Sequence, residues 1–463
     1  MSVIVVGAGP TGLVLACELH RRGVPCRLLE RTPHLPAGSR GKGIQPRTQE
    51  ILDDLGVIEA VRAAGADYPT LRIHQPDGGV HDTRMDEVHP ATSDAPYPNI
   101  WMLPQWKLGE ILAQRLRELG GDIQFDADVL QIHQDDAGVR VEVATNGVVE
   151  EYAADYLVGA DGGRSLVRKA LGVDFLGETI ESVRMLIADV RVDGLSRDFW
   201  HIWPEGQGVR LALCPLPGTD QFQLTAPLAA DGDPAPIEDL LVDGKLLDVG
   251  WTSIYRANVR MVDRYRVGRV FLAGDAAHVH SPAGGQWPHT GIQDAYNLGW
   301  KLASVVLGGA GDLLDSYQDE RLPVAAGVLG ISTALLNKAT AGDATAHRRD
   351  DPDLKQLGVG YRDSRLSIDE RTNPSGVRAG DRAPDGPCPD TGRIFDALRG
   401  PQWTLLAAGA SVTVPGVTTV AIDPATYGAE RPTLYLVRPD GYVGLVTEMI
   451  DASRVTSYLR TYS

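Results

Sequence analysis

The chain has 463 residues, of which 43% are hydrophobic and 23% charged, and its formal net charge is −17. A chain of this length and composition can fold into more than one globular domain. Its acidic balance argues against nucleic acid or an anionic membrane as partner, because both bind basic surfaces.

The cysteines and the apolar runs predict a cytoplasmic protein. The four cysteines lie far apart: Cys17, Cys26, Cys214 and Cys388. They form neither a CxxC pair nor a zinc-ligand spacing, which is typical of a reducing compartment. No basic segment precedes the first apolar run, so no signal peptide is expected. The longest weakly charged run, residues 323–336, is shorter than the roughly 20 residues that span a bilayer.

The first element is a predicted strand at residues 3–6, a continuous β-branched run that is typical of a buried parallel strand. A glycine pattern G-x-G-x-x-G and the start of a predicted helix follow: Gly7, Gly9, Pro10, Thr11 and Gly12. The first glycine allows a tight turn, the second lets the backbone approach a pyrophosphate, and the third lets helix pack on strand. The free N–H groups of the helix would face the phosphates.

A second predicted strand, residues 24–30, ends at Glu30, and Arg31 follows it. A carboxylate at this place accepts hydrogen bonds from ribose hydroxyls and disfavours a 2′-phosphate. Strand, turn, helix and acidic residue together make the pattern specific for a dinucleotide. The pattern alone does not distinguish FAD from NAD.

Two later segments repeat the order strand, glycine, aspartate. Residues 154–165 place Asp161 after a strand, and residues 268–278 place Gly274 and Asp275 after another. An acidic side chain there can hold a ribose or ribityl hydroxyl. Residues 290–306 then predict a helix with an apolar stripe. Its N-terminus would face a negatively polarised group, such as the pyrimidine edge of a flavin.

These segments resemble the FAD-dependent aromatic hydroxylases of the p-hydroxybenzoate hydroxylase type. The motifs are "GAGPTG", "DGGRSLVRK" and "GDAAHVHSPAGGQ", and the resemblance covers nearly the whole chain. It implies FAD as cofactor. It also implies that Arg40 in "SRGKGIQPRTQEIL" contacts the flavin and that Gln105 in "LPQWKLGEIL" faces the ribityl chain. The subgroup that modifies aromatic polyketides in actinomycetes looks most similar.

The resemblance implies an α/β fold class: a Rossmann-type FAD-binding domain, an interleaved β-sheet substrate domain and a C-terminal thioredoxin-like domain. We expect the FAD-binding domain at residues 1–75, 101–175 and 262–341, and the sheet domain at 76–100 and 176–261. A linker and helical segment (342–377) leads to the C-terminal domain (378–463). Cys388 is the only cysteine in that domain, so it lacks CxxC and is expected to serve packing or dimer support. A monomer or a homodimer fits.

The middle segment, residues 176–261, alternates apolar and polar residues as sheet strands do. In the family this sheet forms a wall of the substrate chamber. Its aromatic side chains favour a bulky apolar or aromatic substrate of the polyketide type: Trp200, His201, Trp203, Phe222 and Tyr255. We select His201 and Tyr255 as chamber candidates. No catalytic acid or base can be named. No metal is expected, because His278 and His280 lack a third ligand.

The loop "GGQWPHTG" departs from the family, which usually reads Gly-Gly-Gln-Gly-x-Asn-Thr. Trp287 replaces the glycine, Pro288 is inserted and His289 stands in place of asparagine. Proline removes a backbone N–H from the turn, and tryptophan would lie beside the ring or in the chamber. Trp287 and His289 are therefore chamber candidates as well. We expect the flavin to be contacted by both retained and altered residues of this loop: Pro282, Gly285, Gln286, Trp287, Pro288, His289 and Thr290.

Two hypotheses follow. The first is a monooxygenase that uses FAD, O2 and transient NADPH or NADH to oxygenate a bulky substrate, as most of the family does. The second is a non-redox cyclase, a Diels-Alderase-like enzyme for [4+2], decalin-forming reactions, that keeps FAD as a scaffold. The altered loop supports the second. A flavin-holding protein without chemistry is a third alternative. We favour the monooxygenase.

Overall fold

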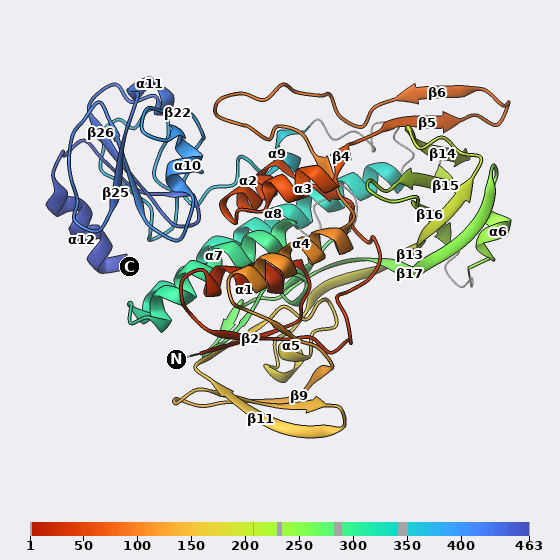
Figure 1. Ribbon diagram of the computed structural model, residues 1–463, viewed down its shortest axis with the longest axis horizontal. Helices are drawn as coiled ribbons and strands as arrows, with labels where there is room; N and C mark the ends of the chain where they lie inside the picture. The colour runs from red at the N-terminus through yellow and green to blue at the C-terminus, as the bar shows by residue number, and fades with distance from the viewer. Residues whose placement is uncertain (1, 207, 229–233, 282–288, 341–350, 463) are drawn as a thin grey trace.

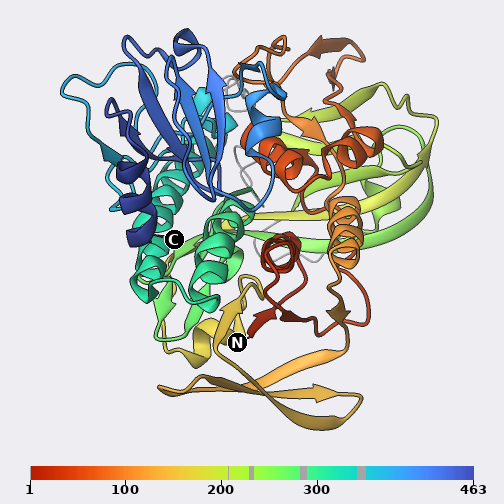
Figure 2. The ribbon, with the colours of Figure 1, turned by 60° about the vertical axis from the view of Figure 1, so that its left-hand side comes forward.

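The computed structural model describes residues 2–206, 208–228, 234–281, 289–340 and 351–462. Two long helices, α7 (His289–Val306) and α8 (Asp315–Thr340), lie at the centre, with the C-terminal domain at one end (Figure 1). Two long strands, β13 (Leu176–Asp193) and β17 (Lys245–Met261), curve away toward the other end. The turned view in Figure 2 shows the same arrangement, so the three regions share one helical centre.

A six-stranded sheet forms the nucleotide-binding core, in the order β18-β19-β12-β1-β2-β8. The pairs from β19 to β8 are parallel, and β18 is antiparallel to β19. The strands are β1 (Val3–Val6), β2 (Cys26–Leu29), β8 (Ile123–Gln124), β12 (Tyr156–Gly159), β18 (Arg266–Val267) and β19 (Val270–Leu272). All four residues of β1 are buried, as its continuous apolar sequence predicts.

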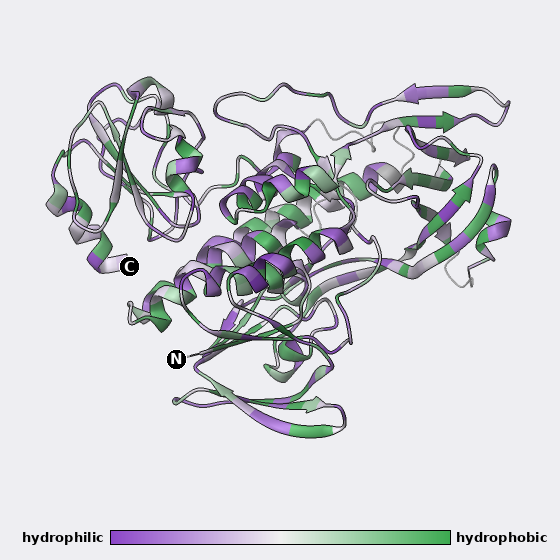
Figure 3. Cartoon of the chain, in the orientation of Figure 1, coloured by the Kyte–Doolittle hydropathy of each residue, from purple (hydrophilic) through white to green (hydrophobic). Residues whose placement is uncertain are grey.

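Helices α1 (Pro10–His20), α4 (Gln105–Glu118) and α7 pack beside this sheet. Figure 3 shows hydrophobic and hydrophilic residues mixed along α4, which buries one stripe only. The approach of α7 to α1 is very close, because a β-carbon at Gly299 would lie 2.5 Å from the Glu18 β-carbon. The helix carrying the third motif is thereby fixed against the helix carrying the first.

The middle segment forms an eight-stranded sheet, in the order β20-β17-β13-β16-β15-β14-β5-β6. The strands not yet introduced are β5 (Thr70–His74), β6 (Val80–Thr83), β14 (Phe199–Glu205), β15 (Gly208–Pro215), β16 (Phe222–Leu228) and β20 (His278–Val279). Strand β5 pairs in parallel with β14. The sheet therefore includes residues 70–74, which the sequence had placed in the FAD-binding domain.

The two faces of this sheet have different partners. Asp189 lies opposite both Gln223 and Trp251, and Gln223 lies opposite Cys214, so these side chains share one face. We call it the chamber face. The other face carries an apolar cluster that includes Ala188, Leu213 and Leu224, next to the short helix α6 (Ile237–Leu240).

Smaller elements connect these parts. A three-stranded sheet joins β3 (Gly43–Ile44), β7 (Trp101–Met102) and β4 (Ala66–Asp67), and a second comprises β9 (Ala127–Gln134), β10 (Val139–Thr145) and β11 (Val148–Ala154). Short helices are α2 (Pro46–Asp54), α3 (Ile58–Ala64), α5 (Leu166–Ala170) and α9 (Pro352–Lys355), with 3₁₀ turns η1 (Gly274–Ala276) and η2 (Gly311–Leu314).

The C-terminal domain is built on a five-stranded sheet, in the order β21-β27-β26-β24-β25. Its strands are β21 (Ile368–Asp369), β24 (Thr404–Ala408), β25 (Thr418–Ile422), β26 (Thr433–Val437) and β27 (Val443–Thr447), with the hairpin β22 (Pro387–Cys388) and β23 (Gly392–Arg393). Helices α10 (Ile394–Leu398), α11 (Pro424–Tyr427) and α12 (Ala452–Tyr462) accompany it. Strand β21 comes from the segment expected as linker.

A buried ion network joins this domain to the central helices. Arg438 donates to both carboxylate oxygens of Glu320 on α8, at 2.6 and 2.9 Å, and also pairs with Asp440. Lys301 on α7 reaches the same Glu320 at 2.7 Å. Burial alone would raise the pKa of Glu320, but Arg438 and Lys301 hold it below its ordinary value. The network fixes the C-terminal domain to α7 and α8.

The first prediction concerns this network. Arg438→Met removes the charge that compensates a buried carboxylate, which costs about 3–5 kcal/mol of the free energy of unfolding. Arg362→Met is the matched control, because Arg362 pairs with Asp381 at the surface and is 55% exposed. It should cost less than about 1 kcal/mol. Chemical denaturation of both variants measures the difference; equal losses would contradict the role given to Arg438.

Candidate functional site

The three glycines of the first motif have three different surroundings. A β-carbon at Gly7 would lie 2.4 Å from the carbonyl oxygen of Ala160, and one at Gly12 would lie 1.9 Å from the carbonyl oxygen of Gly7. A β-carbon at Gly9 would meet nothing within 4 Å. The first and third glycines therefore close the turn, and the second faces open space, as a pyrophosphate requires.

The N-terminal end of α1 can bind a negatively charged group. Its N-cap is Gly9, without a side-chain cap, and Pro10 occupies the first turn, so the first-turn N–H groups have no capping side chain. Glu30 is 7% exposed and accepts hydrogen bonds from the Ala8 amide at 2.9 Å and the Thr32 hydroxyl at 2.8 Å. Its carboxylate is thus held beside the turn. Arg31 is exposed.

The structure brings the three predicted motifs together. A β-carbon at Gly274 would lie 2.7 Å from the Thr11 hydroxyl, and one at Gly291 would lie 2.5 Å from it. Thr11 therefore fills a space between η1 and α7 that only glycines leave. On the other side, Gly7 lies against Ala160 and Asp161.

A carboxylate that the sequence reading missed holds this arrangement. Asp294 on α7 accepts hydrogen bonds from the Gly274 amide at 3.0 Å and from Arg321 at 2.7 Å, and its Oδ2 lies 2.6 Å from His278 Nε2. Burial alone would raise the pKa of Asp294, but His278 and Arg321 keep it below its ordinary value. The sequence feature that could have indicated Asp294 is its charge, because the predicted helix contains only one other charged residue, Lys301.

The two aspartates of the later motifs lie in different settings. Asp161 accepts hydrogen bonds from the amides of Leu166 at 2.7 Å and Val167 at 3.2 Å, so it caps α5. Burial raises its pKa. Asp275 is half-buried in η1, and its charge adds to the burial that raises the pKa of Tyr255. Asp275 therefore lies close to a residue of the chamber face.

The remaining predicted flavin contacts are neighbours. The Gly41 amide donates to Gln105 Oε1 at 3.1 Å, and the Gln105 amide donates back to the Gly41 carbonyl at 3.0 Å. Arg40 is exposed, with its guanidinium carbon 5.6 Å from the Trp251 ring centre. The start of α4 is thereby tied to the loop that carries Arg40.

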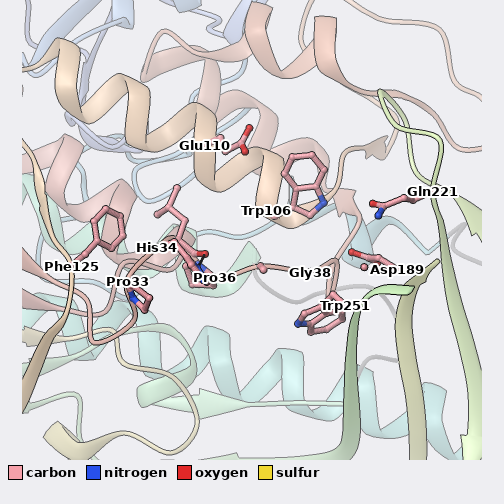
Figure 4. Close-up of a pocket in the computed structure, with 13 residues that line it drawn as sticks. Pro33, His34, Pro36, Gly38, Trp106, Glu110, Phe125, Asp189, Gln221 and Trp251 are labelled. Carbon is pink, nitrogen blue, oxygen red and sulfur yellow. Dashed lines mark hydrogen bonds between the residues drawn. The ribbon is translucent and has the colours of Figure 1, made fainter. Parts of the chain in front are cut away.

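A cavity of about 620 Å³ lies beside these residues. Its walls are the loop at residues 33–38, two residues of α4 and the end of the eight-stranded sheet. Figure 4 shows the indole rings of Trp106 and Trp251 on either side of the loop, with Asp189 and Gln221 at the sheet. A cavity of this volume that is lined by aromatic rings and prolines suits a flat ligand.

The chamber candidates are separated by the sheet. Tyr255 lies on the chamber face, because it pairs with Met185 in register with Asp189 and Trp251, and its hydroxyl donates to the His280 carbonyl at 3.3 Å. His201 pairs with Leu213 on the opposite face. It is 3% exposed and bonds to the Ser196 carbonyl and to His74. The structure does not bring His201 and Tyr255 together.

Most of the altered loop lies outside the described residues: Pro282, Gly285, Gln286, Trp287 and Pro288. His289 begins α7 and is fully buried, with Nδ1 3.1 Å from the Thr48 hydroxyl. Burial lowers its pKa to about 3, so the imidazole is neutral near pH 7. The carbonyl of Thr290 accepts from Arg321 at 3.2 Å, which joins the loop end to the Asp294 cluster.

An open second glycine, an uncapped helix start and a buried acidic residue at the second strand define a dinucleotide-binding fold. Residues 1–332 match the family described as FAD binding domain, and the chain belongs to this family. The non-redox cyclase is not favoured.

Three relatives carry this identification. A flavin-dependent monooxygenase of Mycobacteroides abscessus is 48% identical over 471 residues, which is 97% of each chain. A 12-dehydrotetracycline 5-monooxygenase/anhydrotetracycline 6-monooxygenase of Streptomyces rimosus subsp. rimosus is 34% identical over 502 residues, covering 95% of this chain and 94% of its own. The structure of aklavinone-11 hydroxylase with FAD and aklavinone has a TM-score of 0.83 and 29% identity, covering 100% of this chain and 98% of its own. The protein is an FAD-dependent monooxygenase, as these relatives indicate.

Two further features concern the helices and the metal-ligating side chains in the described part of the chain. None of its helices is long and apolar enough to cross a bilayer. Within the same residues, His, Cys, Asp and Glu form no group of three that could hold a metal ion.

The second prediction separates the two kinds of glycine. Gly9→Ala should leave stability unchanged and weaken FAD binding at least about tenfold, since the new methyl group enters the space facing the helix start. Gly12→Ala should prevent stable folding, because its β-carbon would collide with the Gly7 carbonyl. FAD titration by fluorescence and thermal unfolding measure both.

The control is Gly327→Ala on the exposed side of α8, where nothing lies within 4 Å. It should keep FAD affinity and gain about 0.5–1 kcal/mol of stability. Full FAD affinity in Gly9→Ala would show that the open space does not receive the pyrophosphate.

The third prediction concerns pH. Because the folded pKa of His289 is depressed to about 3, the unfolded chain binds a proton that the folded chain does not between about pH 6.5 and 3. Stability is therefore lost as the pH falls through this window. Between pH 7 and 5, His289→Asn should lose about 2 kcal/mol less than wild type. Denaturation midpoints measure this, with the exposed His133→Asn as control; parallel pH curves would contradict it.

Proposed function

We propose that this monooxygenase uses NADPH or NADH and O2 to oxygenate a bulky, hydroxylated aromatic polyketide of the tetracycline type. The observation that carries the proposal is the aromatic cavity of about 620 Å³ beside the residues predicted to bind flavin. It is supported by relatives named for anhydrotetracycline and aklavinone. Antibiotic biosynthesis is the corresponding metabolic setting.

The residues divide the work. The turn at Gly9 and the N-terminus of α1 would hold the pyrophosphate, and Glu30 the ribose. Arg40, Gln105 and Asp275 would contact the ribityl and ring end. FAD, when bound, supplies electron transfer from the pyridine nucleotide to O2. The sheet and the loop at residues 33–38 would exclude water and orient the substrate.

The enzyme would use NAD(P)H without a separate NAD(P)H-binding domain. The nicotinamide would reach the flavin ring directly and leave again after reduction. Trp287, Pro288 and His289 would then tune how readily the ring is reduced, since the family's Gly-x-Asn is altered there.

The fourth prediction tests this function. Purified holoenzyme is mixed with NADPH or NADH under argon, with and without anhydrotetracycline, and absorbance near 450 nm is followed. The aromatic compound should accelerate bleaching at least about tenfold, because its binding would induce the conformational step that brings nicotinamide and flavin together. Oxygen uptake should follow on aeration.

Two controls make the result specific. Lactose, which is polar and not aromatic, should not accelerate bleaching. The double variant Trp287→Gly/His289→Asn, which restores the family's residue types at these two positions, should be reduced faster than wild type. A flavin that stays oxidised in every mixture would contradict the proposed function.

A further inference from the structure

The loop that carries Arg40 packs against an aromatic side chain of the eight-stranded sheet. A β-carbon at Gly38 would lie 2.1 Å from the Trp251 ring, and Gly38 also has a φ of +85°, so only glycine fits against this indole. Arg40 lies two residues further on, with its guanidinium carbon 5.6 Å from the centre of the same ring. This distance allows a cation–π contact. Trp251 on β17 therefore contacts the loop on both sides of residue 39.

Both backbone groups of Ser39 are bound by side chains of the same sheet. The Ser39 amide donates to Asp189 Oδ2 at 3.0 Å, and the Ser39 carbonyl accepts a hydrogen bond from Gln223 Nε2. Asp189 on β13 and Gln223 on β16 are cross-strand partners, so their side chains are neighbours on the chamber face. We call this pair the Ser39 clamp. It holds the backbone immediately before Arg40 at two points.

The two side chains of the Ser39 clamp are themselves fixed in orientation. Gln223 Oε1 accepts a hydrogen bond from the Lys42 ammonium, so the amide of Gln223 is left with only N–H groups to offer to Ser39. Asp189 is 3% exposed. Burial raises the pKa of Asp189, and the bonds from Ser39 and the charge of Lys42 oppose this shift. The clamp is therefore a buried polar group whose members orient one another.

The loop is held from a second side as well. The Gly41 amide donates to Gln105 Oε1 at 3.1 Å, which ties the loop to the start of α4. Gly38 and Trp251 also line the cavity, where Figure 4 shows them next to each other. Arg40 thus lies between two fixed backbone segments, whereas its own side chain is exposed. This arrangement fixes the backbone of Arg40 and leaves its guanidinium accessible to a ligand.

We propose that Asp189 and Gln223 are positioning residues for Arg40, because they hold the Ser39 backbone so that the Arg40 guanidinium is presented to the flavin. A loop that is ordered before FAD binds loses less conformational entropy on binding, so FAD is held more tightly. The substrate sheet thereby contributes to cofactor binding without contacting the cofactor. This inference rests on the proposed function, which assigns Arg40 to the flavin.

The experiment measures the rate of FAD release from diluted holoenzyme by the recovery of flavin fluorescence. Asp189→Ala removes the acceptor of the Ser39 amide, whereas Asp189→Asn keeps an acceptor oxygen without the charge. Gln223→Glu keeps a partner for Lys42 but, when ionised, cannot donate to the Ser39 carbonyl. The control is Asp220→Ala, because Asp220 is 72% exposed. Thermal unfolding of every variant is measured in parallel.

Arg40→Ala should accelerate FAD release at least about tenfold, since a charge-assisted contact is lost. Asp189→Ala and Gln223→Glu should accelerate it about three- to tenfold, and Asp189→Asn and Asp220→Ala less than about twofold. The double variant Arg40→Ala/Asp189→Ala should release FAD no faster than Arg40→Ala alone, because a positioning residue has no effect once the residue it positions is gone. A merely structural role would multiply the two effects.

Three results would overturn the inference: unchanged FAD release in both Asp189→Ala and Gln223→Glu, multiplied effects in the double variant, or unchanged release in Arg40→Ala. Failure of the proposed function shows differently, as wild-type flavin that NADPH and NADH do not reduce, because the release assay uses neither nucleotide.

Discussion

The buried carboxylate of Asp294 is the constraint on which the flavin site depends. It binds the Gly274 amide, His278 and Arg321 at once, and so joins α7 to the Gly-Asp motif at residues 274–278 and to α8. With Thr11 filling the space left by two glycines, it sets the distance between the first and third motifs. Such a fully paired carboxylate rigidifies a core, whereas an unpaired one would destabilise it.

The rest of the molecule extends this fixed centre. The C-terminal domain is joined to α7 and α8 through Glu320, Lys301 and Arg438. Helix α7 is therefore anchored at both ends. The eight-stranded sheet is tied to the loop that carries Arg40 through Gln223 and Ser39. A domain without redox cysteines thus has a physical task, which is to hold α7 and α8.

The dinucleotide-binding motif could be predicted from the sequence because its parts are local. Strand, glycine turn, helix and Glu30 follow one another within 30 residues, and each step has its own composition. The faces of the middle sheet could not be predicted, because a register shift of one residue exchanges them. His201 therefore lies on the opposite face from Tyr255. Asp294 was missed because Gly274, His278 and Arg321 become its neighbours only in the folded chain.

A monooxygenase of this kind transfers one oxygen atom of O2 to its aromatic substrate. The most direct measurement is mass spectrometry of the product formed from anhydrotetracycline with NADPH under ¹⁸O₂, compared with ¹⁶O₂ and with H₂¹⁸O. We expect a product that gains one oxygen atom, labelled only from ¹⁸O₂. A product of unchanged mass, or one labelled from water, would contradict it.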